Sequence, residues 1–269
     1  MLSKNKIKLV RSLEHRKYRQ SNGLFVAEGP KVVADLMSSF SCCYVCCTRE
    51  WEHSLPSLPE GVECDVVSAE ELRKVSFQEH PQQVLALFRM PLHDDFNDGY
   101  RDTIMSEVTE QCHKSLCLAL DSVQNPGNVG TIIRLADWFG IHSLICSPGT
   151  ADVFSPKVVQ ATMGSLARVS IYQEFQLPLF FDTLSDTVPV YGTFLDGENI
   201  YTSRLDPHGV IVMGNEGNGI SADVAARVNR RITIPNFNGM DQGADSLNVA
   251  VATAVVCSEF RRMSAMRQV

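Results

Sequence analysis

The stretch LCLALDSVQNPGNVGTIIRLADWFG (116–140) joins a short apolar run to a helix through a Pro-Gly turn. Asn128 is expected at the start of that helix, where an asparagine side chain caps free backbone N–H groups. Apolar residues then recur at the i, i+3, i+4, i+7 spacing of a buried helical stripe, which consists of Val129, Ile132, Ile133 and Ala136. Arg134 lies outside this stripe and is therefore expected to face away from the core.

The same strand-then-helix pattern continues along the chain. Short apolar runs, most of them followed by helix-like segments, occupy 143–147, 168–172, 188–194, 209–214 and 231–235. Continuous apolar strands that alternate with helices predict an α/β fold with a mostly parallel sheet covered on both faces. Ligands bind beyond the carboxyl ends of such strands, so the loops that follow them are candidates for a functional site.

Two of these loops combine glycines with polar residues. In VIVMGNEGNGIS (210–221), an apolar strand runs into three glycines interleaved with Asn215, Glu216 and Asn218. Glycines let the backbone approach a ligand closely. The order differs from the G-x-G-x-x-G of dinucleotide sites, which disfavours a nucleotide-dependent enzyme of ordinary doubly wound topology. The other loop follows the apolar run 231–235. Ser246 and Asn248 lie where it runs into a helix, and they either cap that helix or face the ligand loops.

The helix that follows Asn248 is apolar on nearly every face, as its sequence VAVATAVVCSEF (249–260) shows. A helix that is apolar all round has to be buried all round, whereas the outer face of a helix in an α/β domain normally meets water. We therefore expect a second copy of the chain to cover this helix, which predicts a homodimer.

The first ninety or so residues predict a separate, small α/β domain. They alternate helix-like segments (4–18, 30–40 and a capping box at Ser68 and Glu71) with extended ones (24–29, 42–47, 64–67 and 84–89). The polar, turn-rich stretch 91–102 marks the predicted boundary. We expect one domain at 1–95, a linker with some helix at 96–114, and a second domain at 115–269.

The distribution of charge singles out the N-terminus. The net charge of −7 argues against a protein that coats nucleic acid over its whole surface. Residues 1–20, however, hold seven basic residues against the single acid Glu14, a local charge of +6. This segment is either a solvated helix face or a phosphate contact, and the residues predicted to contact phosphate are Lys8, Arg11, Arg16, Lys17 and Arg19.

Cysteines and hydropathy bear on the compartment. No apolar run approaches the roughly 20 residues that span a bilayer, and the basic N-terminus lacks the apolar core of a secretion signal. We therefore expect a cytoplasmic protein, no membrane contact and nine reduced cysteines. The cluster at 42–47 contains the C-x-x-C spacing of zinc sites, but no second pair follows it. A buried strand is the favoured interpretation, and we expect no metal.

Taken together, NPGNVGTIIR (125–134), VMGNEGNGIS (212–221) and the segment from Ile234 through SLNVAVATA (246–254) resemble the three motifs of the SpoU or TrmH branch of the SPOUT methyltransferases. The resemblance covers about residues 116–260. It implies a deep C-terminal trefoil knot, which is an exception to the rule that protein chains are unknotted. The first ninety residues resemble the RNA substrate-binding domain, similar in fold to ribosomal protein L30e, that often precedes this catalytic domain.

The resemblance implies S-adenosylmethionine as cofactor and a ribose 2′-hydroxyl in rRNA or tRNA as methyl acceptor. Carried over position by position, it implies a catalytic group composed of Asn128, Arg134, Glu216, Ser246 and Asn248. It also implies that the knot forms a cofactor pocket from Thr193, Leu195, Gly214, Ile234 and Leu247. In the family mechanism the motif-one arginine, here Arg134, helps remove the hydroxyl proton, with Glu216 and Asn128 orienting it; stabilising a developing alkoxide is the more conservative role.

One departure from the family pattern and one alternative function remain at this stage. The stretch 236–245 is a few residues longer than the glycine turn of many relatives. A non-catalytic RNA-binding protein that kept the SPOUT fold is the main alternative, although all five expected catalytic residues are present. Ribosomal RNA is slightly favoured over transfer RNA, by analogy of domain architecture.

Overall fold

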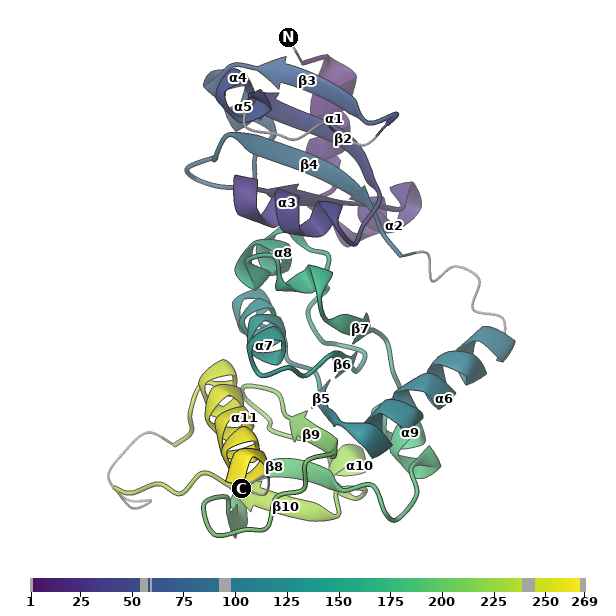
Figure 1. Cartoon of the computed structure of the whole chain (residues 1–269), viewed down its shortest axis with the longest axis vertical. Helices are drawn as coiled ribbons and strands as arrows, with labels where there is room; N and C mark the ends of the chain where they lie inside the picture. The colour runs from purple at the N-terminus through teal and green to yellow at the C-terminus, as the bar shows by residue number, and fades with distance from the viewer. Residues whose placement is uncertain (1, 54–57, 59, 92–97, 239–244, 267–269) are drawn as a thin grey trace. The chain divides into compact units, whose positions relative to one another are not determined.

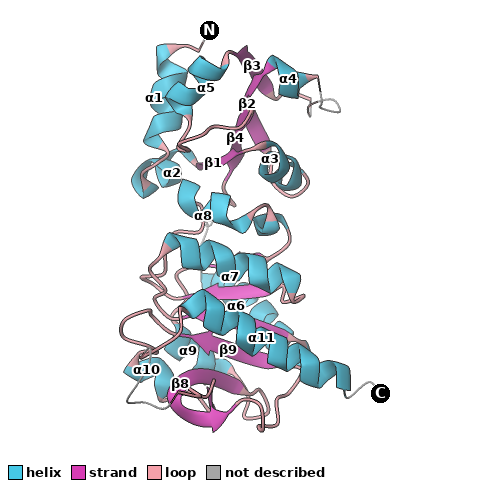
Figure 2. Ribbon diagram, turned by 90° about the vertical axis from the view of Figure 1, so that its left-hand side faces the viewer, coloured by secondary structure: helices cyan, strands magenta, loops and turns pink. Residues whose placement is uncertain are grey.

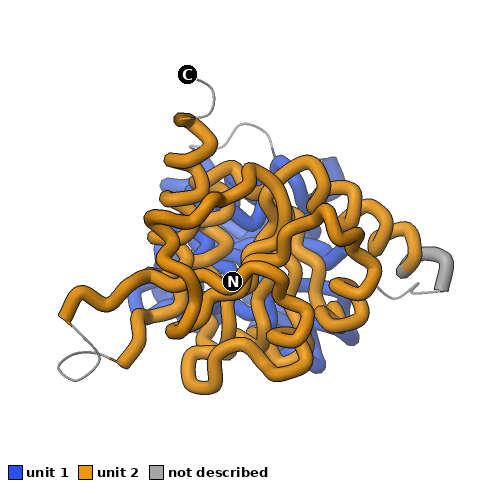
Figure 3. Tube along the Cα trace, turned by 90° about the horizontal axis from the view of Figure 1, so that it is seen from below, with its two compact units in different colours: residues 1–94, 152–168 blue, residues 95–151, 169–269 orange. Residues whose placement is uncertain are grey.

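The chain divides into two compact units in the computed structural model. The structure describes residues 2–53, 58, 60–91, 98–238 and 245–266, with side chains left undescribed at 98–101. Unit 1 contains residues 1–94 and 152–168, and unit 2 contains residues 95–151 and 169–269 (Figure 3). Most of the longer 236–245 loop lies outside the described residues.

Unit 1 is built on a sheet of order β1-β4-β2-β3, in which only the β2–β3 pair is parallel (Figure 1). Its strands are β1 (Leu24–Glu28), β2 (Cys42–Thr48), β3 (Glu63–Val67) and β4 (Val84–Arg89). Its helices are α1 (Lys4–Ser12), α2 (Arg16–Asn22), α3 (Pro30–Met37), α4 (Arg49–Glu52), α5 (Ala69–Val75) and α8 (Pro156–Thr162), with a 3-10 turn, η1 (Ser165–Ala167). The predicted basic helix 4–18 is thus two helices.

Local sequence signals explain several of these elements. Ser68 and Glu71 form the predicted capping box, in which each side chain bonds to the other residue's backbone N–H. The cysteine-rich segment is β2, as expected, and burial raises the pKa of the Cys46 thiol to about 12. Such thiols stay protonated at neutral pH and act as small apolar core residues, which agrees with the structural interpretation of the cluster.

Arg19 is not the surface residue that the sequence suggested. Its side chain is buried, donates to the carbonyl oxygens of Leu13 and Glu14, and lies 2.5 Å from the carboxylate of Asp152. The buried guanidinium therefore pairs with a half-buried acid inside unit 1 and is not accessible to a phosphate. The partner comes from the segment 152–168, and no pattern in the first twenty residues reveals it.

The same segment also supplies apolar contacts within unit 1. Phe154 packs against Phe25 of β1 and Phe40, with ring centroids 5.0 and 6.4 Å apart, respectively. Residues 152–168 are thus integrated into the core of unit 1. By contrast, 96–114, expected to be a linker, contains α6 (Asp98–Lys114), whose Val108 and Cys112 are buried in the core of unit 2.

Unit 2 contains a six-stranded sheet of order β10-β8-β9-β5-β6-β7, and every neighbouring pair of strands is parallel. This confirms the predicted parallel α/β sheet. Its strands are β5 (Leu116–Leu120), β6 (Ser143–Cys146), β7 (Ser170–Tyr172), β8 (Val190–Asn199), β9 (Gly209–Met213) and β10 (Arg230–Thr233). Its remaining helices are α7 (Pro126–Trp138), α9 (Leu177–Thr183), α10 (Ala222–Ala225) and α11 (Val249–Met266).

Helices cover both faces of this sheet. Cys117 and Ala119 of β5 face a cluster formed with α6, α9 and α10. Successive strand residues point to opposite faces, so the row that contains Leu118 faces the other layer. In that row Tyr191 packs edge-on against Phe260 of α11, with ring centroids 4.9 Å apart. Figure 2 shows α7 and α11 lying together across this side of the sheet.

Three further observations concern the described part of the chain. None of its helices is long and apolar enough to cross a membrane. No group of three or more His, Cys, Asp or Glu side chains is arranged there to hold a metal ion. All nine cysteines are free, as the sequence predicted.

Replacing Arg19 by methionine should destabilise unit 1 strongly, because it removes the buried guanidinium that pairs with Asp152 and leaves that carboxylate only the backbone N–H of Phe154. Removing one partner of a buried ion pair typically costs about 3–5 kcal/mol of unfolding free energy. Urea unfolding followed by circular dichroism measures the loss. As a control, Lys114→Met breaks an exposed pair with Glu110 and should change stability by less than about 1 kcal/mol. Equal effects in the two variants would contradict the buried role.

Candidate active site

A cavity of about 530 Å³ lies at the carboxyl ends of β9 and β10, beside the middle of β8. The pairing of β8 with β10 jumps from Gly192 to Glu198, so residues 193–197 have no partner in β10. Thr193 and Leu195, within this excursion, line the cavity together with residues of the loops that follow β9 and β10. All five residues of the predicted cofactor pocket are found in this lining: Thr193, Leu195, Gly214, Ile234 and Leu247.

The loop after β9 is a closed turn that requires glycine at its start. Asn215 and Gly219 exchange two backbone hydrogen bonds, and the Asn215 side-chain oxygen accepts from the N–H groups of Gly217 and Asn218. A Cβ atom added to Gly214 would lie 2.3 Å from the carbonyl carbon of Gly219. Only glycine permits this close approach of two backbone segments at the cavity wall.

Glu216 extends from this turn and joins it to the loop after β5. Its carboxylate accepts hydrogen bonds from the backbone N–H groups of Gln124 and Asn125 at 3.1 and 3.0 Å, and from the side-chain amide of Asn128 at 2.9 Å. Burial by itself would raise the pKa of Glu216, but these hydrogen bonds outweigh it and lower the pKa below the ordinary carboxyl value. Glu216 is therefore an ionised acceptor and a poor proton acceptor at neutral pH.

The expectation that Asn128 caps α7 is wrong. The N-cap is Asn125, whose side chain accepts from the N–H groups of Gly127 and Asn128, and Pro126 occupies the first helical position. The cap lies outside Pro126 because proline is tolerated at that first position. Asn128 is thereby released from capping and uses its amide to bind Glu216 and Asn248.

Asn248 has both of the roles that the sequence left open: it caps α11, and it bonds to Asn128. Its side-chain oxygen accepts from the N–H groups of Ala250 and Val251 at the start of α11, and its amide nitrogen donates to the Asn128 oxygen at 3.0 Å. The chain of bonds Glu216–Asn128–Asn248 thus links the loops that follow β9, β5 and β10. Ser246 lines the cavity beside this chain.

Arg134 stands apart from this network. It is exposed on α7, and among the described residues it makes no ion pair or hydrogen bond with Glu216 or Asn128. The expected orienting bonds to Arg134 are therefore absent from this structure. The helical period explains this: position 134 lies six residues after Asn128, roughly 120° away around the helix axis.

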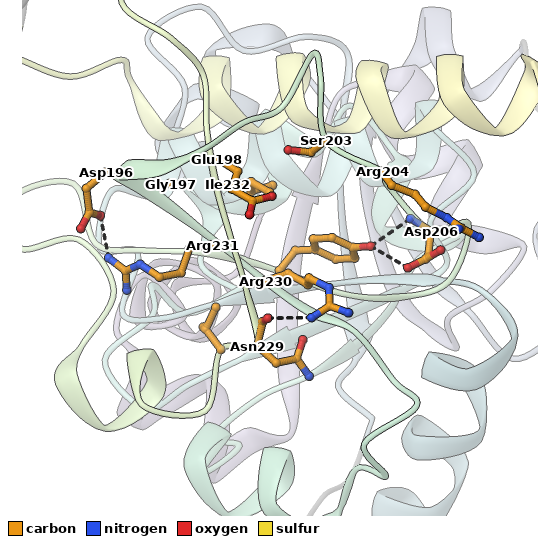
Figure 4. A pocket seen from close by; sticks show the side chains of 12 residues that line it. Asp196, Gly197, Glu198, Ser203, Arg204, Asp206, Asn229, Arg230, Arg231 and Ile232 are labelled. Atoms are coloured by element: carbon orange, nitrogen blue, oxygen red, sulfur yellow. Dashed lines mark hydrogen bonds and ion pairs between the residues drawn. The ribbon is translucent and has the colours of Figure 1, made fainter.

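A second, larger cavity of about 760 Å³ lies along β8 and β10, outside the predicted motifs (Figure 4). Its lining contains three arginines, of which Arg231 pairs with Asp196 at 2.6 Å, and three acids. The Tyr191 hydroxyl donates to Asp206 and accepts from its backbone N–H. The positive and negative side chains of this larger cavity balance each other, and its lining belongs to the edge of the sheet. We therefore take the smaller cavity, at the strand ends, as the candidate site.

Sequence reasoning missed several residues of that site. Gln124 and Asn125 contribute only backbone N–H groups to Glu216, and no side-chain pattern reports such a role. The α11 residues Val249, Ala252 and Val256 line the cavity. They were counted only as part of an apolar helix, although their i, i+3, i+7 spacing marks one helical face.

These features define a class of protein: an α/β protein whose ligand cavity is built by the excursion of β8 and by the loops that follow β9 and β10. Comparison with known sequences is specific. The chain belongs to the SpoU rRNA methylase family, whose model matches residues 115–258. A second model, described as the MRM3-like substrate binding domain, matches residues 4–86.

Individual relatives cover nearly the whole chain. The 23S rRNA (guanosine(2553)-2′-O)-methyltransferase of Bacillus subtilis is 30% identical over 95% of this chain and 96% of its own. A structure from Porphyromonas gingivalis, described as TrmH family, has a TM-score of 0.81 at 40% identity, over 97% of this chain and 99% of its own. An S-adenosylmethionine-bound rRNA methyltransferase from Sinorhizobium meliloti has a TM-score of 0.80 at 27% identity, over 97% and 96%.

These matches confirm three predictions made from the sequence. The chain is a member of the SpoU/TrmH family, its activity is RNA 2′-O-methyl transfer, and its cofactor is S-adenosylmethionine.

Gly214→Ala should weaken cofactor binding, because its methyl group collides with the Gly219 backbone and distorts the cavity wall. Overpacking of this kind costs about 1–3 kcal/mol, so calorimetric titration with S-adenosylmethionine should show roughly a tenfold loss of affinity. Asp186→Ala, at an exposed position outside the cavity lining, is the control and should keep the affinity of the wild type. Unchanged affinity in Gly214→Ala would move the cofactor elsewhere.

Proposed function

We propose that the chain methylates a ribose 2′-hydroxyl of large-subunit ribosomal RNA, with the cofactor held in the 530 Å³ cavity. The observation that carries this proposal is the bonded chain Glu216–Asn128–Asn248, of which Glu216 lines that cavity. It joins the three loops that the family motifs occupy. The choice of large-subunit RNA is supported by the name of the Bacillus subtilis relative, which spans the same length.

The cavity residues fit S-adenosylmethionine. The volume of the cavity is within the range of roughly 300–1,000 Å³ that is usual for small-molecule sites. Apolar side chains of Leu195, Leu247 and Val256 offer contact area for an adenine ring, and the glycine turn exposes backbone groups for the polar parts of the cofactor. In this proposal Thr193, Leu195, Gly214, Ile234 and Leu247 bind the cofactor. When bound, S-adenosylmethionine supplies a methyl group already activated by its positive sulfur.

The protein must then position the ribose and assist loss of its proton. In the transfer the ribose oxygen would use a lone pair to bond to the methyl carbon, the bond from that carbon to sulfur would break with its electron pair left on the sulfur, and the hydroxyl proton would pass to water. Positioning the two reactants in line is the largest contribution that a rigid site can make. We assign this positioning to Asn128, Ser246 and Asn248, which lie at or next to the cavity and are fixed by α7, α11 and Glu216.

Arg134 is the proposed electrostatic partner of the reacting oxygen. Guanidinium groups stay protonated at neutral pH, so a stabilising role suits Arg134 better than proton removal. Its side chain is exposed and makes no ion pair among the described residues, so it is available to an RNA phosphate or a developing alkoxide. Because its face of α7 is turned away from Glu216, we propose that RNA or a second copy of the chain completes the site around it.

A homodimer formed through α7 and α11 is the proposed assembly. α11 packs against α7, yet Val251 is 52% exposed and Trp138 is 83% exposed on this layer. Burial of such apolar surface favours association. A second copy on this layer would satisfy the sequence argument that the helix must be covered on all sides.

The trefoil knot remains part of the proposal. The chain passes from β9 to β10 on the far side of β8, and then returns to α11, which packs on α7. On this return, Leu247 lines the same cavity as Leu195 from the excursion of β8. Threading the C-terminal segment through the loop after β8 accounts for this meeting of distant segments.

Unit 1 is the proposed RNA-binding part, with a fold like that of ribosomal protein L30e, and the catalytic unit receives the target ribose. The match of residues 4–86 to a substrate-binding family supports this division. Lys8, Arg11, Arg16 and Lys17 are exposed and stay as proposed phosphate contacts, whereas Arg19 is withdrawn. Free cysteines throughout the chain suit the reducing cytoplasm, which is the proposed compartment.

Arg134→Ala should abolish methyl transfer while leaving cofactor binding intact. Losing one electrostatic stabiliser of a developing oxyanion lowers kcat by about 100- to 1,000-fold. Radiolabelled methyl transfer to unmodified 23S rRNA measures the activity, and calorimetry measures cofactor affinity. Arg227→Ala, which breaks an exposed pair with Asp182, is the control and should keep full activity. Wild-type turnover by Arg134→Ala would remove this residue from the mechanism.

Val251→Glu should convert the dimer to a monomer, because it places a charge in the proposed apolar interface. Sedimentation velocity measures the mass of wild type and variant at the same concentration. Leu179→Glu is the matched control: Leu179 is 63% exposed on α9, on the opposite layer. A monomeric wild type, or a dimer that persists in Val251→Glu, would contradict this interface.

A further inference from the structure

The outer surface of α1 carries a regular basic track. Lys4 and Lys8, at i and i+4, lie along one face of the helix and are exposed. Arg11 follows on the same face, but its guanidinium donates to the Ser76 carbonyl oxygen at 2.7 Å and lies over the Phe77 ring. Lys6 is turned to another side, where it binds Glu63 and Asp65 of β3. Among the described residues Lys4 and Lys8 form no ion pair, so their charge is available to a ligand.

The next helix, α2, carries an exposed aromatic ring. Tyr18 on α2 is 45% exposed, beside the exposed Lys17. Its only ring neighbour among the described residues is His15, at 6.3 Å between centroids and 59° between planes. The Tyr18 ring is therefore supported on one side and open on the other.

The turn that presents Tyr18 is fixed from inside the unit. Buried Arg19, the next residue, bonds to the carbonyl oxygens of Leu13 and Glu14 and to Asp152. These bonds hold the end of α1 and the start of α2 in one arrangement. A ring held in place before binding loses little conformational entropy when a ligand stacks on it, which favours a binding role.

We infer that α1 and α2 bind an unpaired segment of the substrate RNA, with phosphates on Lys4 and Lys8 and a base stacked on Tyr18. Surfaces that bind single-stranded nucleic acid combine a basic track with aromatic platforms. Double-stranded RNA offers phosphates and 2′-hydroxyls but no open base face. The basic track alone would accept either form, and Tyr18 is the feature that selects an unpaired strand.

This inference rests on the proposed function and names the form of RNA that unit 1 receives. It is also consistent with the protein's net negative charge. With a net charge of −7, most of the surface repels RNA, so contacts concentrate where basic side chains are free of acid partners. Base stacking adds affinity there without further positive charge.

The test compares two probes on the full-length protein at low salt. One is a fluorescein-labelled oligouridine of about 12 nucleotides, within the range of single-strand site sizes; the other is an RNA duplex of equal length. Fluorescence anisotropy should show tighter binding of the oligouridine. Tyr18→Ala should weaken oligouridine binding about tenfold, as loss of one stacked base does, and leave duplex binding unchanged.

Three further variants make the result specific. Tyr18→Phe keeps the ring and should bind oligouridine like wild type. Tyr201→Ala, which removes a tyrosine 42% exposed in unit 2, should have no effect. Lys8→Gln should weaken the binding of both probes. The slope of log affinity against log salt concentration should fall by about the contribution of one phosphate contact.

Two outcomes would overturn the inference: unchanged oligouridine binding in Tyr18→Ala, or equal losses for the single strand and the duplex. Either result leaves the proposed function standing if the wild type still methylates 23S rRNA. If the wild type does not methylate 23S rRNA but its oligouridine binding still depends on Tyr18, the proposed function alone is rejected.

Discussion

The hydrogen bonds accepted by Glu216 hold the catalytic unit's functional loops in one place. A single carboxylate receives two backbone N–H groups from the loop after β5 and the side-chain amide of Asn128. Asn128 in turn accepts from Asn248, which begins α11. Because the carboxylate stays ionised, these bonds are charge-assisted and stronger than bonds between neutral groups. The loops separated by some 90 and 120 residues thereby become one surface beside the cavity.

Much of the fold could be predicted from the sequence, because the central strands β5 and β9 are apolar throughout and α7 carries a regular apolar stripe. The failures have specific causes. Asn128 was given the capping role because it precedes the apolar stripe, although Pro126 points to Asn125 as the cap. The burial of Arg19 depends on Asp152, 133 residues away, and no local pattern reports such a pairing.

The candidate site was predicted unevenly for the same reason. Side chains that recur in a family motif, such as Glu216 and Asn248, could be named from the sequence through resemblance. Backbone donors such as those of Gln124 and Asn125 could not, because every residue has one and only the fold selects them. Counting charges also overstated the basic N-terminus, since Lys6 and Arg19 are neutralised by acids within unit 1.

The segment 152–168 lies inside the stretch matched by the methylase family but packs in unit 1. One cut in the chain therefore cannot separate the two units. Deleting residues 1–94 would strip Phe154 of its partners Phe25 and Phe40 and leave the Asp152 carboxylate without Arg19. In evolutionary terms, recombination that exchanges the N-terminal domain must exchange residues 152–168 as well, because this segment packs within unit 1.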